Sequence, residues 1–85
     1  MTLLDALGRR WTLRILWELR AGALSFRALR AAADDVSPSV LNARLAQLRE
    51  MGVVGTGDDG YMLTPSGREL AETLLVLNDW AKRYV

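Results

Sequence analysis

The side chains of this chain that are able to do chemistry are mostly arginines and small polar residues. Ten of its eleven cationic residues are Arg, whose planar guanidinium forms forked hydrogen bonds to phosphate or carboxylate. The 85 residues include no His and no Cys. Disulfides, thiol redox switching and thiolate metal ligands are therefore excluded, and zinc, iron and nucleophile–base chemistry are disfavoured. We expect a protein with no catalytic residues, no metal site and no cofactor.

The positive charge lies in the first half of the chain. Residues 1–50 carry eight arginines against five carboxylates, a net charge of +3, whereas residues 51–85 carry a net charge of −2. A basic N-terminal half hints at nucleic-acid binding. An ordinary solvated surface explains the same composition equally well, so composition alone does not establish nucleic-acid binding.

The most informative polar set lies on residues 37–51, which we expect to form a helix. At ~100° per residue, Leu41, Leu45 and Leu48 face the core. The other sides carry the candidate DNA contacts, namely Ser37, Ser39, Val40, Asn42, Ala43, Arg44 and Gln47. Small residues let the backbone approach a groove floor, and polar side chains among them are suited to reading base edges. An amphipathic helix with a neutral solvent face, carrying Glu50, is the alternative interpretation.

Phosphate contacts need cations or free backbone N–H groups. Arg44 on the flank of this helix, and the helix N-terminus at Ser37, are suited to phosphate. Arg27 and Arg30, on the exposed side of the preceding helix, are further candidates. Simple surface charge explains these two arginines equally well.

Helices and one hairpin must position these residues. We expect helices over residues 2–8, 12–21, 25–33, 37–51 and 65–84, with Thr2, Thr12, Ser25, Ser37 and Thr64 as N-caps. Pro follows Ser37 and Thr64, where its missing N–H does no harm. Strands at 53–54 and 61–63, joined by a turn over residues 55–60, predict a hairpin.

Three compact helices followed by a hairpin predict a mainly α winged helix-turn-helix fold. We expect one domain over residues 1–85. Residues 37–51 would be its recognition helix and residues 53–63 its wing.

The last predicted helix is too apolar for one of its sides to face water. Leu70, Leu74, Leu77, Ala81 and Tyr84 form a seam that Leu75, Val76 and Trp80 widen. Burial across a two-fold axis would explain this width and enlarge a small core. We therefore expect a homodimer whose interface includes Leu3, Leu4, Leu7, Leu74, Leu77 and Trp80. Trp11 and Trp17 are interpreted as core residues, whereas Trp80 fits the core and the dimer interface equally well.

The chain resembles the HxlR-type family of transcriptional regulators. Residues 7–16 are similar to its opening motif GGKWTLLIL, residues 25–29 to RFxEL and residues 36–48 to ISxKxLTxRLxxL. Residues 61–70 resemble YxLTxxGxxL, and residues 78–81 resemble LxxWA. The resemblance implies a bacterial homodimer on pseudo-palindromic DNA. It further implies that the helix from Ser37 reads DNA, that the hairpin is the wing, and that the first and last helices form the dimer.

Two features depart from that family. Its members often carry an N-terminal Cys that senses electrophiles or oxidants, and a chain without Cys has no such sensor. Their wings usually carry Arg or Lys, whereas residues 54–60 include two Asp and no cation. Carboxylates repel DNA phosphates, so we expect this wing to touch DNA through backbone N–H groups or Thr56, or not at all.

The leading prediction is a dimeric, sequence-specific, DNA-binding transcriptional regulator. The alternative is a winged-helix module that binds another protein without strong DNA binding, which the acidic wing and near-neutral net charge favour. An enzyme is a distant third. No signal peptide or apolar run of ~20 residues is present, so we expect a cytoplasmic, nucleoid-associated protein without membrane contact. We find no residues that identify a small-molecule effector.

Overall fold

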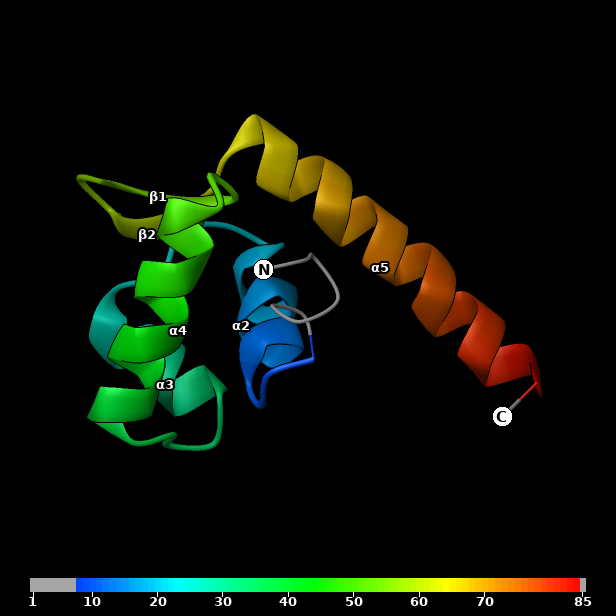
Figure 1. Cartoon of the computed structure of the whole chain (residues 1–85), viewed down its shortest axis with the longest axis horizontal. Helices are drawn as coiled ribbons and strands as arrows, with labels where there is room; N and C mark the ends of the chain where they lie inside the picture. Colours follow the sequence, from blue (N-terminus) through cyan, green and yellow to red (C-terminus); the bar gives the residue numbers. More distant parts are fainter. Residues whose placement is uncertain (1–7, 85) are drawn as a thin grey trace.

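The computed structural model describes residues 8–84. Its elements are α2 (Thr12–Leu19), α3 (Phe26–Ala32), α4 (Pro38–Glu50), β1 (Val54–Gly57), β2 (Gly60–Leu63) and α5 (Pro65–Tyr84). Helices α2 to α4 lie together beside the hairpin, and α5 runs diagonally away from them (Figure 1). This arrangement confirms the predicted mainly helical fold with a two-stranded hairpin. The helix expected over residues 2–8, with Leu3, Leu4 and Leu7, lies outside the described residues apart from Gly8.

The hydrophobic core lies where α2, α3, α4 and the hairpin meet. Its largest fully enclosed apolar side chains come from these three helices and are Ile15, Leu16, Leu19, Leu29, Leu41, Leu45 and Leu48. From the other side of the core, β1, β2 and α5 add Val54, Leu63 and Ala71. Helix α5 contributes to this core through its first half, because Leu70 and Leu74 pack against it.

Side-chain caps fix the starts of α3, α4 and α5 as predicted. The hydroxyl oxygens of Ser25, Ser37 and Thr64 accept backbone N–H groups of Ala28, Val40 and Gly67, respectively. Such a bond satisfies a donor that the first turn of a helix leaves unpaired.

The predicted cap at Thr12 is wrong. Helix α2 starts one residue earlier than that role requires, so Trp11 is its N-cap and makes no side-chain cap bond. Trp11 adopts a left-handed conformation, with φ of 77°. The Thr12 hydroxyl is buried inside the protein and has no hydrogen-bond partner among the described residues.

The hairpin is tighter than the sequence predicted. Val54 pairs with Leu63, and the antiparallel ladder continues to Gly57 and Gly60. The predicted turn over residues 55–60 is therefore wrong, because only Asp58 and Asp59 form the loop. Gly60, with φ of 110°, provides the positive φ that neither Asp58 nor Asp59 adopts, and this permits the tight connection.

A third segment pairs with the hairpin. Leu24 and Tyr61 exchange backbone hydrogen bonds of 3.0 and 2.8 Å, which attaches the approach to α3 to strand β2. The ring centroids of Phe26 and Tyr61 lie 6.4 Å apart. These contacts hold the hairpin against the helices that precede it.

The start of α5 is fixed to the end of α4. The Thr64 hydroxyl donates to the Gly52 carbonyl over 2.6 Å, and the Thr64 N–H donates to the Val53 carbonyl. Gly67 sits directly against Val53, so a side chain at this position would collide with the Val53 carbonyl group. This close approach sets the direction in which α5 leaves the hairpin.

Candidate nucleic-acid interface

The core anchors helix α4 and thereby decides which of its faces is open. Leu41, Leu45 and Leu48 are buried. Pro38 occupies the first turn behind the Ser37 cap, and Gly52, with φ of 78°, lies just beyond the helix end. Since three leucines hold one side, the opposite side of α4 faces solvent.

The open face of α4 is made of small and polar side chains. Ser37, Ser39, Asn42 and Ala43 are exposed, as are Ala46, Arg49 and Glu50. A face with this composition lets a helix backbone approach closely, and Ser39 and Asn42 provide hydrogen-bonding groups suited to base edges.

Contrary to the prediction, Val40 and Gln47 do not lie on the open face. Both are half-buried, together with Arg44, on the flank of α4 that is turned toward the start of α2. The Arg44 Nη1 lies 3.4 Å from the Gln47 Oε1, and the Arg44 Nε is buried without a hydrogen-bond partner within residues 8–84. Residues 9–11, which lead into α2, lie beside this flank, which the helical wheel alone had left open.

Helix α3 lies on the other flank of α4. Arg27 and Arg30 share a hollow of about 280 Å³ with Pro38 at the start of α4. Arg27 is exposed, whereas Arg30 is half-buried and its Nε donates to the Val36 carbonyl over 2.7 Å. Arg30 thus also stabilises the turn between α3 and α4, a role that the sequence did not reveal.

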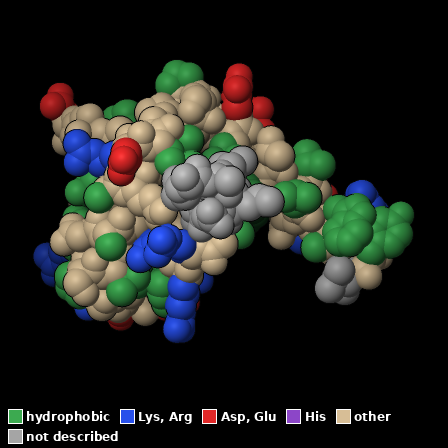
Figure 2. All heavy atoms as spheres, viewed as in Figure 1, with side chains coloured by type: hydrophobic (Ala, Val, Ile, Leu, Met, Phe, Trp, Pro, Cys, Tyr) green, Lys and Arg blue, Asp and Glu red, His purple; other side chains and the backbone are tan. Residues whose placement is uncertain are grey.

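The tip of the hairpin is acidic and exposed. Asp58 and Asp59 form the loop, and both face solvent. Figure 2 shows acidic side chains at this end of the molecule and Lys and Arg side chains near the start of α2. Since the hairpin contains no cation, its tip offers phosphates repulsion and little attraction.

Arg9 and Arg10 were not among the predicted site residues, yet the structure places them beside α4. Both are exposed, in the turn that leads into α2. The Thr12 N–H donates to the Arg9 carbonyl over 3.2 Å and closes that turn. The excess of positive charge in the first half of the chain was the only available signal, because the sequence places these residues about 30 positions from α4.

Another arginine of this region has an internal role. Arg14 forms salt bridges of 2.7 Å with Glu18 and 3.1 Å with Asp34, and it donates to the Ala32 carbonyl. The hydrogen bond to Glu18 is the main cause that raises the pKa of Arg14. This guanidinium therefore ties α2 to the end of α3.

Comparison with known proteins identifies the family. Residues 6–85 match the family model described as HxlR-like helix-turn-helix. The chain belongs to the HxlR-like family. This confirms the resemblance seen in the sequence motifs, and it makes the protein a DNA-binding helix-turn-helix transcriptional regulator rather than an enzyme.

Individual relatives agree with this assignment. The chain is 32% identical over 88 residues to the uncharacterized HTH-type transcriptional regulator YvaP of Bacillus subtilis, covering 95% of this chain and 82% of YvaP. The crystal structure of quinone-bound YodB from B. subtilis superposes with a TM-score of 0.88 at 26% identity, covering 95% of this chain and 92% of YodB. A possible HxlR family transcriptional factor from Thermoplasma volcanium has a TM-score of 0.85 at 25% identity. The match covers 96% of this chain and 80% of the Thermoplasma chain.

The second half of α5 in this HxlR-like regulator presents an apolar face to solvent. Val76, Leu77, Trp80 and Tyr84 are 68%, 58%, 51% and 71% exposed, and they share one side of the helix. The Trp80 and Tyr84 rings lie 5.6 Å apart, and hydrophobic side chains gather at this end of the molecule (Figure 2). Leu74 is instead half-buried against the core, and Trp80 is not a core residue.

The described part of the chain contains no membrane-spanning element. No helix within residues 8–84 has both the length and the hydropathy that a bilayer crossing requires.

Proposed function

We propose that this HxlR-like regulator binds a specific, pseudo-palindromic site in double-stranded DNA as a homodimer. The open face of α4 carries the proposal. It combines Ser39, Asn42 and Ala43 at its N-terminal half with a core-anchored opposite side. The α-helix fits the major groove, which exposes a different pattern of donors and acceptors for each base pair.

In this mechanism each subunit places α4 in one major groove. Asn42 and Ser39 read base edges, and Ala43 contacts groove atoms at close range. Arg44, Arg27 and Arg30 bind phosphates and hold α4 in register, as does the N-terminus of α4 at Ser37. Half-sites are separated by one helical turn, ~34 Å, or by a multiple of it.

The exposed face of α5 supports the homodimer. Contiguous apolar side chains on a small regulator mark an interaction surface, and a second copy of the same helix matches them in chemistry. We infer that Leu77 and Trp80 lie at the centre of this interface. Leu74 contributes at its edge, and Leu3, Leu4 and Leu7 are proposed to add to it. We expect a protein that binds DNA in this form to lie in the cytoplasm with the nucleoid.

The second candidate is a winged-helix module that binds protein in place of DNA. The acidic hairpin tip, with Asp58 and Asp59 exposed, is the observation that favours it. Binding to mixed genomic DNA distinguishes the two, since only a DNA-binding protein shows an affinity that falls steeply with salt.

Selection of bound fragments from the genome of the source organism tests the proposal. We expect enrichment of fragments that share an inverted repeat. A duplex with one scrambled half-site should then bind the dimer far more weakly than the intact site. Recovery of fragments without a common sequence, or equal affinity for the scrambled duplex, would contradict specific binding by a dimer.

A further inference from the structure

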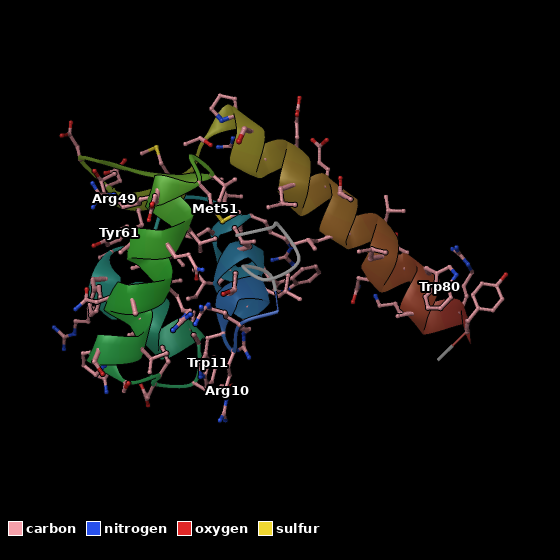
Figure 3. The ribbon with its side chains drawn as sticks, in the orientation of Figure 1. Arg10, Trp11, Arg49, Met51, Tyr61 and Trp80 are labelled. Carbon is pink, nitrogen blue, oxygen red and sulfur yellow. The ribbon has the colours of Figure 1, made fainter. Side chains whose placement is uncertain are left out.

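We propose that Arg9 and Arg10 contact DNA phosphates on the flank of α4 that faces α2. The inference rests on the proposed function and adds residues that neither the α4 face nor the hairpin supplies. Both arginines precede α2, outside the helix-turn-helix formed by α3 and α4. Figure 3 shows Arg10 and Trp11 at the start of α2, close to the first half of α4 and far from Trp80.

Two hollows place these arginines beside α4. One, of about 310 Å³, is lined by Arg9 together with Ala43, Ala46 and Glu50 of the open α4 face. The other, of about 400 Å³, is lined by Arg9, Arg10 and Trp11 together with Val40 and Arg44. A groove wall that receives α4 would therefore lie directly against both guanidinium groups.

Both charges are available for this contact. Arg9 and Arg10 are exposed and form no ion pair with any residue of the described range 8–84. Neighbouring Arg14 differs, because Glu18 and Asp34 neutralise it. The Arg10 guanidinium lies 5.6 Å from the centroid of the Trp11 ring, which is itself packed against the core.

Arg9 and Arg10 complete a pair of basic flanks around the recognition helix. On the helical wheel of α4, Pro38 lies on the side of α3 and Arg44 lies on the side of the start of α2, ~120° apart. The open face occupies the longer of the two arcs between these residues. Arg27 and Arg30 would thus contact phosphates along one wall of the groove. Arg9, Arg10 and Arg44 would contact phosphates along the other wall. An α-helix about 10–12 Å across fills a major groove about 12 Å wide, so both phosphate walls come within reach.

This arrangement moves the phosphate contacts away from the hairpin. A basic wing would reach the backbone beyond the end of α4, whereas the acidic tip at Asp58 and Asp59 does not. The turn before α2 supplies the missing cations next to the middle of α4. The backbone footprint of each subunit is then expected to centre on the recognition helix.

Salt dependence of binding to a fluorescein-labelled, 30-base-pair duplex of random sequence tests this proposal in the full chain. Each lost phosphate contact lowers the slope of log K against log salt by about 0.9. The double variant Arg9→Gln/Arg10→Gln removes both contacts from each of the two subunits and should therefore lose about 3.6 from the slope. The variant Arg9→Lys/Arg10→Lys keeps both charges and should retain most of it.

A matched control removes the same charge elsewhere. Arg20 and Arg68 are exposed and line the hollow of about 420 Å³ between α2 and α5. The variant Arg20→Gln/Arg68→Gln should leave the slope within about 0.5 of the unaltered protein, well below a single contact. If the Arg9→Gln/Arg10→Gln and Arg20→Gln/Arg68→Gln variants had equal slopes, the inference would be overturned and the proposed function would remain intact. No salt-dependent binding by the unaltered chain would overturn both.

Circular dichroism separates a lost contact from a lost fold. If the double Gln variant does not fold, the single variants Arg9→Gln and Arg10→Gln carry the test, and each should lose about 1.8 from the slope, because both subunits lose the contact. A folded single variant with an unchanged slope removes that residue from the proposed contact.

Discussion

Replacing Trp80 by Ala tests the dimer that the proposed function requires. Trp80 is 51% exposed on the apolar face of α5 and contacts Tyr84. A tryptophan side chain buries up to ~250 Å² in total, so a partner that covers it would remove ~120 Å² more from water. At ~25 cal/mol per Å², this burial contributes ~3 kcal/mol for each subunit.

An isologous interface contains Trp80 twice, so the full effect would be ~6 kcal/mol if the partner covered both rings completely. Coverage of only half of this surface still leaves ~3 kcal/mol. Since 1.4 kcal/mol corresponds to a factor of ten, the Trp80→Ala variant should raise the Kd of the dimer by at least ~100-fold. The subunit core is far from this position and should keep its stability.

Sedimentation equilibrium from submicromolar to high micromolar concentration measures this change. Leu75→Ala is the matched control, because Leu75 is a partly exposed apolar residue on the other side of the same helix. The control should leave the Kd of the dimer within a few-fold of the unaltered protein. A stable monomer at tens of micromolar, or a Kd that Trp80→Ala does not change, would refute the assignment of α5 to the dimer.

Three further substitutions test a phosphate contact, a base contact and a packing contact of the fold. Arg44→Ala should weaken binding to all duplex sequences and lower the salt slope by ~1 for each subunit bound, and a changed sequence preference at constant slope would contradict a phosphate role. Asn42→Ala should relax specificity at one base position by ~1–3 kcal/mol, measured by competition among single-base variants of the selected site, and an unchanged preference would exclude base contact. Gly67→Ala should lower the free energy of unfolding in urea by ~1–3 kcal/mol, because its Cβ meets the Val53 carbonyl. An increase, as helix propensity alone would give, would disprove that close approach.

The hairpin and the α2 cap show where local sequence rules fail. Glycines at 55, 57 and 60 indicated a long turn, but the ladder from Val54 and Leu63 continues through them to a two-residue loop. Thr12 is a good N-cap residue by type, yet packing of α2 buries its hydroxyl and leaves Trp11 at the cap. At Thr12, tertiary packing outweighed a capping preference worth ~1 kcal/mol.

The amino-acid sequence by itself determined the order of elements, the caps of three helices and the family. Caps and apolar periodicity act within a few residues of chain, so their signals are local and readable. It also determined the chemistry, since a chain without Cys and His leaves arginines and small polar groups to contact a partner.

Only the tertiary structure decided which flanks of α4 are basic and which half of α5 is free. Arg9 and Arg44 meet across about 35 positions of the chain because the leucines of α2 and α4 share one core. Likewise, the contact between Gly67 and Val53 directs α5 outward, so that Leu74 packs on the core while Leu77 and Trp80 remain exposed. These outcomes depend on packing between distant segments, which no local pattern of residue types encodes.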